Sequence, residues 1–292
     1  MPAHNSSTTI SDVLRFSRLP DREAELLLSF LKRKSREYLL THTEESINPQ
    51  FYKKFLALEK KRIENWPIAY LTGHKEFYGL DYKVTPAVLV PRPETEMIVD
   101  EVLSIIKETG SANIIDVGTG SGAITIAVAT EIRRLFPGVY KKSNFTAIDI
   151  SRSALQIARH NAVKHRLGKK IKFHRGNLLT PINQLKWKAL PLVITANLPY
   201  LTPIQIKQSP SITREPKLAL GGGPDGLKYY RQLFAQLKLL LADRRSCHLF
   251  CEIDPSQAVT IKGLAKKYFP TADTEIRKDL SGKKRLARVN IK

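Results

Sequence analysis

The sequence has little cysteine and no long apolar run. Its 292 residues include two cysteines, and no apolar stretch approaches the roughly 20 residues that span a bilayer. The N-terminal stretch "MPAHNSSTTISDVLRF" also lacks the apolar core and cleavage site of a secretory signal. Cys247 and Cys251 have no partner cysteine or histidine at zinc-site spacing, so we expect buried reduced thiols and no metal. These absences predict a cytoplasmic protein that does not span a membrane.

Acidic residues are scarce in the second half of the chain. The net charge is +21, yet residues 1–149 carry 20 Lys and Arg against 19 Asp and Glu. Residues 150–292 carry 28 against 8, with no acidic residue between Asp149 and Glu215. This distribution favours a polyanionic partner, such as the ribosome or another nucleic acid, met through the basic C-terminal half. A basic surface that is merely solvated explains the charge equally well.

The length of the chain suits two domains. Residues 1–71 show apolar residues at helical spacing, and Asn48 followed by Pro49 marks a helix start. Residues 72–92 belong to a strand–turn–strand pattern, so we expect a β-hairpin linker with His74 in its turn. In residues 93–292 strands alternate with helices, which predicts an α/β domain with a mostly parallel sheet covered on both faces.

A glycine-rich loop follows the first predicted strand of this domain, in "NIIDVGTGSG". Its G-x-G-x-G spacing is typical of S-adenosylmethionine sites, whereas dinucleotide sites use G-x-G-x-x-G. Asp149, at the end of the next strand, is placed to accept hydrogen bonds from ribose hydroxyls. A strand-to-helix turn needs no ligand, but the pairing with Asp149 makes that interpretation weaker. The candidate loop residues are Gly118, Thr119, Gly120, Ser121 and Gly122.

A second motif, Asn197-Leu198-Pro199-Tyr200, ends a later apolar strand. The side-chain carbonyl of Asn197 and the backbone carbonyl of Leu198 can hold both hydrogens of a planar amino group. Pro199 fixes the local backbone, and Tyr200 can pack flat on the amide or base. The catalysis would then consist of positioning and polarisation, with no nucleophilic side chain. A strand end followed by Asn-x-Pro can also be a simple turn.

These motifs together resemble the HemK/PrmC family, methyltransferases that modify the glutamine of the Gly-Gly-Gln loop in peptide chain release factors. The resemblance runs almost end to end, through "PIAYLTGHKEFYGLDYKVTPAVLVPRPETE", "AIDISRSALQIARHNA", "EPKLALGGGPDGLKYYRQL" and "KDLSGKKRLARV". It implies a Rossmann-like class I methyltransferase domain preceded by a helical domain that docks the release factor. It further implies that the glycine loop and Asp149 bind S-adenosylmethionine and that Asn197 to Tyr200 hold the substrate glutamine.

Two positions depart from the family pattern. Leu198 stands where the family usually has proline, a form shared with ribosomal RNA adenine dimethylases. Asn177, beside Leu178, stands where the family commonly places an acid against the adenine amine of the cofactor. We count Asn177, Leu178 and also Asn197 among the cofactor-binding residues. At Asn177 we expect weaker, not absent, cofactor binding, because an amide carbonyl accepts the bond without the charge.

Two other functions therefore stay open at this point. One is a nucleic-acid adenine methyltransferase, which Leu198 and the basic stretch favour. The other is a non-catalytic binding protein that has lost turnover. His160, His165 and His174 have no carboxylate nearby in the sequence, so we do not expect them to bind a metal. Arg92 and Glu94 either border the site or form a structural ion pair, and "GGGPDG" is either a flexible loop or part of the site.

Overall fold

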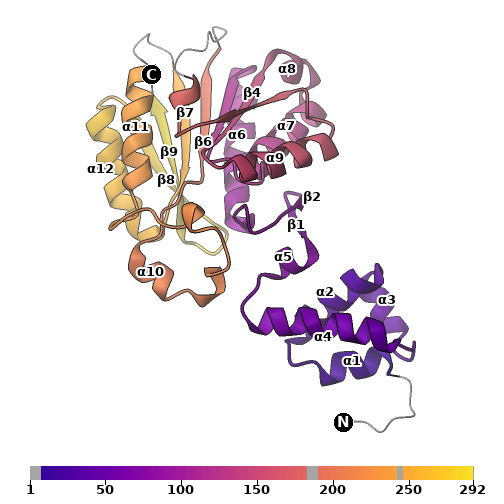
Figure 1. Cartoon of the computed structure of the whole chain (residues 1–292). Helices are drawn as coiled ribbons and strands as arrows, with labels where there is room; N and C mark the ends of the chain where they lie inside the picture. Colours follow the sequence, from indigo (N-terminus) through magenta and orange to yellow (C-terminus); the bar gives the residue numbers. More distant parts are fainter. Residues whose placement is uncertain (1–7, 183–189, 242–245, 292) are drawn as a thin grey trace. The chain divides into compact units, whose positions relative to one another are not determined.

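The computed structural model describes residues 8–182, 190–241 and 246–291. The chain forms two compact units, which Figure 1 shows in sequence colours. The small unit contains the chain up to His74 together with Pro210–Arg214, and the large unit contains Lys75–Ser209 and Glu215–Lys292. Within the described residues, no helix is long and apolar enough to cross a bilayer.

The small unit is helical. Its core is an apolar cluster that includes Leu27, Leu28 and Phe55. The predicted start of the long helix is confirmed, because the Asn48 side chain accepts a hydrogen bond from the Phe51 backbone and Pro49 is the first helical residue. The helices are α1 (Ile10–Phe16), α2 (Asp21–Lys32), α3 (Arg36–Thr41), α4 (Pro49–Ile63) and α5 (Ile68–Thr72).

The hairpin that follows differs from the prediction in its register. The stretch read as its first strand contains helix α5, which ends at Gly73 in the left-handed conformation. The strands are β1 (His74–Phe77) and β2 (Leu80–Lys83), so His74 begins a strand and does not lie in the turn. The turn is Tyr78-Gly79, with φ values of 52° and 69°. Two positive φ values in a two-residue loop match the twist of the flanking strands.

The large unit contains a seven-stranded sheet with the order β5-β4-β3-β6-β7-β9-β8. The five strands β3 to β7 are parallel, and β9 runs antiparallel to both β7 and β8. The predicted α/β class with a mostly parallel sheet is confirmed. The chain order reverses between β3 and β6, the place where open α/β sheets bind ligands. The strands are β3 (Asn113–Val117), β4 (Asn144–Asp149), β5 (Ile171–Arg175), β6 (Leu192–Ala196), β7 (Cys247–Glu252), β8 (Asp273–Lys278) and β9 (Lys284–Ile291).

Helices cover both faces of this sheet (Figure 1). One core cluster packs α6 (Glu96–Thr109), α7 (Ala123–Leu135) and part of α9 (Arg152–Lys164) on the sheet. A second cluster packs α11 (Lys228–Leu240) and α12 (Ala258–Tyr268) on the other face. Cys247 and Cys251 are buried free thiols in this second cluster, as predicted. The short helices are α8 (Pro137–Lys142) and α10 (Pro203–Lys207), and the described residues contain no His, Cys, Asp and Glu group suited to a metal ion.

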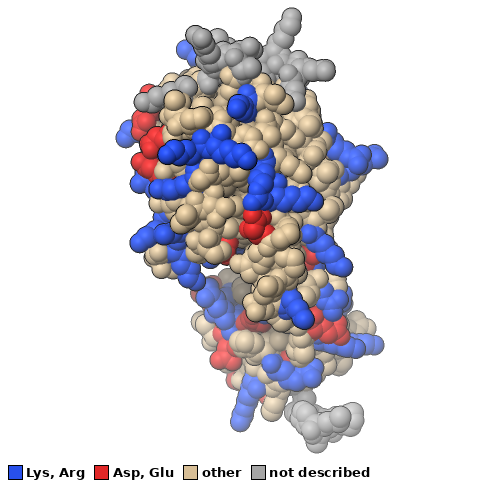
Figure 2. Space-filling model, turned by 90° about the vertical axis from the view of Figure 1, so that its left-hand side faces the viewer, with Lys and Arg blue, Asp and Glu red and all other residues tan. Residues whose placement is uncertain are grey.

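Basic side chains are spread over the face of the large unit that carries α11 and α12. Figure 2 shows Lys and Arg over this face, with few acidic side chains among them. On α12 the lysines are exposed, because its buried residues Ala258, Ile261 and Ala265 occupy the opposite stripe. The exposed lysines of the two helices are Lys228, Lys238, Lys262, Lys266 and Lys267.

Candidate active site

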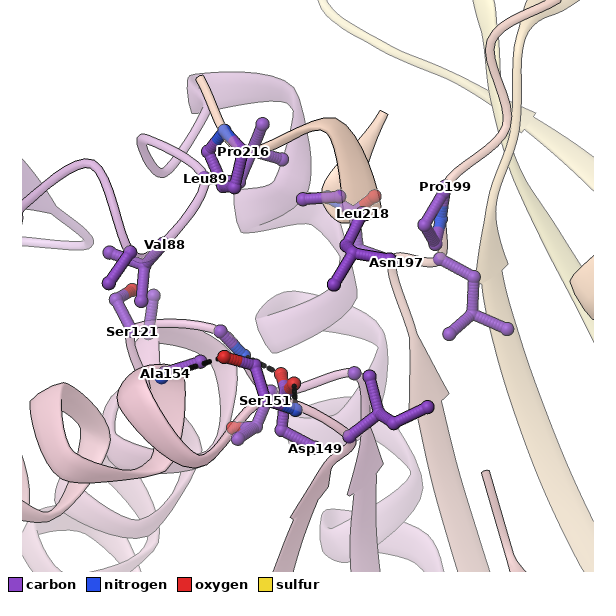
Figure 3. Close-up of a pocket in the computed structure, with 18 of the residues that line it drawn as sticks. Val88, Leu89, Ser121, Asp149, Ser151, Ala154, Asn197, Pro199, Pro216 and Leu218 are labelled. Atoms are coloured by element: carbon purple, nitrogen blue, oxygen red, sulfur yellow. Dashed lines mark hydrogen bonds between the residues drawn. The ribbon is translucent and has the colours of Figure 1, made fainter. Parts of the chain in front are cut away.

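A cavity of about 340 Å³ lies at the carboxyl ends of the parallel strands, lined only by residues of the large unit. It brings together loops that are far apart in the sequence. The glycine loop follows β3, Asp149 ends β4, residues 176–178 follow β5, and residues 197–199 follow β6. Figure 3 shows Asp149 and Ser151 on one side of this cavity, with Leu89 and Pro216 across from them. The predicted cofactor and acceptor residues, apart from Gly122 and Tyr200, therefore line one cavity.

The glycine loop turns with positive φ at Gly118, Gly120 and Gly122. A Cβ on Gly118 would lie 3.0 Å from the Leu198 side chain, so only glycine lets the two loops approach this closely. Gly122 is not among the residues that line the cavity. A Cβ there would lie 2.9 Å from Ile126 and 3.3 Å from Ala158, so this glycine allows α7 to pack closely on α9.

A buried carboxylate that the sequence reading missed supports the loop. Asp116 accepts hydrogen bonds from the hydroxyls of Thr119, Thr125 and Thr195, at 2.6, 2.7 and 2.8 Å. Burial raises its pKa, and the three hydroxyl donors oppose that rise. Asp116 thus ties the loop to α7 and to β6. Thr119 and Thr125 follow Asp116 closely in the sequence, whereas Thr195 is brought to it by the pairing of β3 with β6.

Asp149 has part of its hydrogen-bonding capacity in use. Its Oδ2 accepts the backbone N–H of Gly120 at 2.9 Å, and its Oδ1 accepts that of Ser151 at 2.8 Å. Burial raises the pKa of Asp149, and backbone N–H donors oppose the rise. Each carboxylate oxygen has a further lone pair, and the residue lines the cavity. A ribose hydroxyl could therefore bind here without displacing the existing contacts.

Asn177 and Leu178 both line the cavity at its β5 side. Asn177 is exposed, whereas Leu178 is buried and belongs to the core. Leu178 has a φ of 54°, an uncommon conformation for a residue other than glycine. This turn fixes the backbone beside Asn177 and leaves its side chain at the rim.

The structure divides the Asn-Leu-Pro-Tyr motif between the cavity and the interior. Asn197, Leu198 and Pro199 line the cavity, but Tyr200 is not among its lining residues. The Leu198 side chain is only 3% exposed and packs in the core. The Tyr200 hydroxyl donates to Glu252 Oε1 at 3.0 Å.

Asn197 is held from behind by two further side chains. Its Nδ2 donates to Glu252 Oε2 at 2.9 Å and to Thr95 Oγ1 at 3.0 Å. The Thr95 hydroxyl in turn donates to Glu252 Oε2 at 2.5 Å. Neither side chain was a candidate site residue in the sequence. Glu252 ends β7, which pairs with β6, and Thr95 lies in the turn just before α6.

The "GGGPDG" loop packs against the motif and is not merely a flexible loop. The Gly222 backbone N–H donates to the Leu201 carbonyl at 2.9 Å. The Gln257 side chain donates to the carbonyls of Tyr200 and Asp225, at 2.8 and 3.3 Å. A Cβ on Gly226 would lie 2.0 Å from the Tyr200 carbonyl oxygen. The loop therefore supports the backbone that presents Asn197.

The opposite wall of the cavity contains residues 86–89, 91 and 92. Arg92 was predicted either to border the site or to form a structural ion pair, and it does both. It lines the cavity and pairs with the buried Glu215. Glu215 Oε2 also accepts the Val90 backbone N–H at 3.1 Å. Glu94 is not among the lining residues. The ion pair fixes this wall to the segment that carries Pro216 and Leu218, which also line the cavity.

Fold and cavity together define a methyltransferase domain, and the comparisons with known proteins agree. A family model described as a methyltransferase domain matches residues 108–210. The N-terminal domain of human METTL16 in complex with SAH has the same fold, with a TM-score of 0.52 at 17% identity, covering 94% of this chain and 97% of that one.

Sequence relatives define the family more narrowly. A model described as the PrmC N-terminal domain matches residues 8–73. The release factor glutamine methyltransferase of Moorella thermoacetica is 38% identical over 91% of this chain and 89% of its own length. The enzyme of the same name from Bacillus subtilis is 35% identical over 91% and 89%. The chain belongs to the family of release factor glutamine methyltransferases, as the motifs predicted.

Proposed function

We propose that this protein transfers a methyl group from S-adenosylmethionine to the side-chain amide nitrogen of the glutamine in the Gly-Gly-Gln motif of peptide chain release factors, in the cytoplasm. The observation that carries the proposal is that the glycine loop, Asp149, Asn197 and Leu198 all line the same cavity. The names of the sequence relatives support the acceptor.

The cavity fits S-adenosylmethionine in its chemistry. Gly118 and Gly120 line it, and neither carries a side chain that would fill the space beside the loop backbone. Asp149 would accept hydrogen bonds from the ribose, and Asn177 would accept one from the adenine amine, with Leu178 beside it. Thr119 and Ser121 would contribute to the same wall. When bound, this cofactor supplies an electrophilic methyl group on a sulfonium.

The acceptor side works by positioning. Asn197 Oδ1 and the Leu198 carbonyl would each accept one hydrogen of the glutamine amide. This arrangement holds the amide nitrogen in place and raises its electron density, so that its lone pair can point toward the methyl group. Pro199 would keep the two acceptors at a fixed spacing, and Tyr200, which does not line the cavity, would hold the motif in place through the bond of its hydroxyl to Glu252. No side chain of this set acts as a nucleophile.

The buried position of Leu198 supports the same function. Its side chain packs against Gly118 and the core, so the residue contributes its backbone carbonyl to the acceptor site. A leucine here therefore does not by itself indicate an adenine acceptor. The likeness to METTL16 is a likeness of fold and gives no support to an RNA substrate. The names of the sequence relatives favour a catalytic protein over the non-catalytic alternative.

Two regions outside the cavity would bind partner molecules. We assign residues 1–71 to a domain that helps bind the release factor and residues 93–292 to the catalytic domain. Residues 72–92 would be a linker whose second half also supplies one wall of the cavity. The exposed lysines on α11 and α12 support a contact with a polyanion such as ribosomal RNA (Figure 2).

The test offers two acceptors in parallel to the purified protein with methyl-labelled S-adenosylmethionine. One is a release factor, with a matched control in which the motif glutamine is alanine, and the other is unmodified ribosomal RNA. We expect label on the Gly-Gly-Gln peptide, located by mass spectrometry, and none on the alanine control. Label on RNA alone, or label that persists in the alanine control, would overturn the proposal.

A further inference from the structure

A buried carboxylate lies behind the acceptor site without lining the cavity. Glu252, at the end of β7, is 3% exposed. Its two oxygens accept hydrogen bonds from three side chains, those of Thr95, Asn197 and Tyr200. The carbonyl of the same residue accepts the Tyr230 hydroxyl. This is a costly place for a carboxylate, and burial raises its pKa.

The chemistry of Glu252 determines which way the Asn197 amide faces. A carboxylate has only acceptor oxygens, so the group that Asn197 turns to it must be the amide nitrogen. The hydroxyls of Thr95 and Tyr200 also donate to this carboxyl group, so its oxygens act as acceptors toward all three neighbours. Asn197 lines the cavity, so its Oδ1 is the polar atom left for that side.

The opposite orientation of the Asn197 carboxamide would prevent the acceptor amide from binding. It would present two N–H donors to the N–H hydrogens of the acceptor, which is repulsive and removes one of the two acceptors that hold the amide. The two orientations of a carboxamide have nearly the same shape, so packing alone does not select between them. Hydrogen-bond chemistry has to make the selection.

We propose that Glu252 is a positioning residue for methyl transfer, which orients the Asn197 carboxamide with its oxygen toward the acceptor and anchors the Tyr200 hydroxyl. Thr95 assists it, because its hydroxyl accepts from Asn197 and donates to Glu252. The inference rests on the proposed function, in which Asn197 binds the acceptor amide.

The test compares two substitutions of Glu252. Glu252→Leu removes both acceptor oxygens, and we expect kcat to fall about 10-fold or more, with little change in the Kd of S-adenosylmethionine. The substitution also leaves the donors of Thr95, Asn197 and Tyr200 without their acceptor, which lowers stability, so folding of the variant is checked by circular dichroism before its activity is measured. Glu252→Gln should retain most of the turnover, because its oxygen can accept from Asn197 while its nitrogen donates to the Tyr200 oxygen. Glu275→Leu, on the exposed β8 strand, is the matched control.

A second readout does not need the methyl acceptor. Hydrogen exchange of the Asn197 side-chain amide, followed by NMR and assigned with Asn197→Asp, should be slow in the wild type and faster in Glu252→Leu. If Glu252→Leu unfolds, turnover and exchange are compared in Thr95→Val and Thr95→Ser instead. Thr95→Val removes the hydroxyl that bonds to Asn197 and Glu252, whereas Thr95→Ser keeps it. Unchanged turnover and exchange in Glu252→Leu would overturn the inference. Wild-type failure to label release factors would instead overturn the proposed function, and the exchange measurement would still decide the role of Glu252.

Discussion

Asn197 and Asn177 carry the same carboxamide on the same cavity, but their surroundings give them different tasks. Asn197 is held from behind by Thr95 and Glu252 and has one orientation. Asn177 is exposed at the rim. A fixed amide suits a reacting centre, whereas a rim amide suits the binding of a cofactor edge. Substitutions at the two positions should therefore separate turnover from cofactor affinity.

Asn197→Ala removes one of the two carbonyls that would hold the acceptor amide. We expect kcat on a release factor to fall about 100-fold, by analogy with the loss of one stabilising group from an oxyanion site. The Kd of S-adenosylmethionine, measured by calorimetry, should change less than about threefold, because the glycine loop and Asp149 are unaltered. Turnover that survives this substitution would remove Asn197 from the mechanism.

Asn177→Asp tests the departure from the family pattern. A carboxylate accepts a stronger hydrogen bond than an amide carbonyl, so S-adenosylmethionine should bind about 3- to 10-fold more tightly. The same calorimetric titration measures the difference, with kcat expected to change little. Weaker binding by the Asp variant would show that the rim does not contact the adenine amine.

At the scale of elements, the loop after η4 (Lys217–Ala219) supports the acceptor motif through close backbone contact. Gly226 has a φ of 73°, and a Cβ there would lie 2.0 Å from the Tyr200 oxygen and 2.1 Å from the Gln257 amide. We expect Gly226→Ala to lower the free energy of unfolding by about 2 kcal/mol or more and to reduce turnover, because the backbone at Tyr200 must move.

A matched control lies in α12, where Gly263 has no heavy atom within 4 Å of an added Cβ. Gly263→Ala should stabilise the protein by about 0.5–1 kcal/mol, since alanine is the better helix former. Urea unfolding and a methyl-transfer assay on both variants make the comparison. Equal stability of the two alanine variants would show that the loop is not closely packed at Gly226.

The elements that could be predicted from the sequence are those whose pattern lies within a few consecutive residues. The strands before the glycine loop and before Asn197 are short apolar runs with a turn signal at the end, and both strands are confirmed. Helix α5 was misread as a strand because it is only five residues long, too short to show a helical period. Its boundary residues, Pro67 and Gly73, were the better signal.

The network around Asn197 was not predictable by the same means. Asn197 is separated from Thr95 by 102 residues and from Glu252 by 55. The side-by-side pairing of β6 and β7 brings Glu252 near Asn197, and no local pattern encodes that register. The role of "GGGPDG" was hidden for the same reason, and so was the bond from Thr195 to Asp116, since both depend on contacts between distant segments.

At the scale of the whole molecule, buried carboxyl groups make stability depend on pH. Burial raises the pKa of Asp116 and Glu252 above that of the unfolded chain. The folded state then binds more protons than the unfolded state between the two pKa values, so its stability falls as pH rises through that window. We expect the free energy of unfolding to decline from about pH 4.5 upward in the wild type and to decline less in Glu252→Gln. Urea unfolding at a series of pH values measures the free energy of unfolding of the wild type and of Glu252→Gln. The same pH dependence in both proteins would contradict a raised pKa at Glu252.

The basic surface leads to a prediction about association. The exposed lysines of α12 lie on the face seen in Figure 2, with few carboxylates to neutralise them. If this face contacts ribosomal RNA, binding to ribosomes should weaken with salt, and each phosphate contact should contribute about 0.7–0.9 to the slope of log K against log salt. Replacing Lys262, Lys266 and Lys267 by alanine should flatten the slope by about 2 to 3.

Methylation of a free release factor provides the control for this prediction. The α12 lysines are not among the residues that line the cavity, so the triple variant should keep the wild-type kcat on a release factor in the absence of ribosomes. If the slope of log K against log salt is the same in the variant as in the wild type, the ribosome contact does not involve the α12 lysines. An equal loss of activity with and without ribosomes, in a variant whose urea unfolding is unchanged, would mean that these lysines meet the release factor itself.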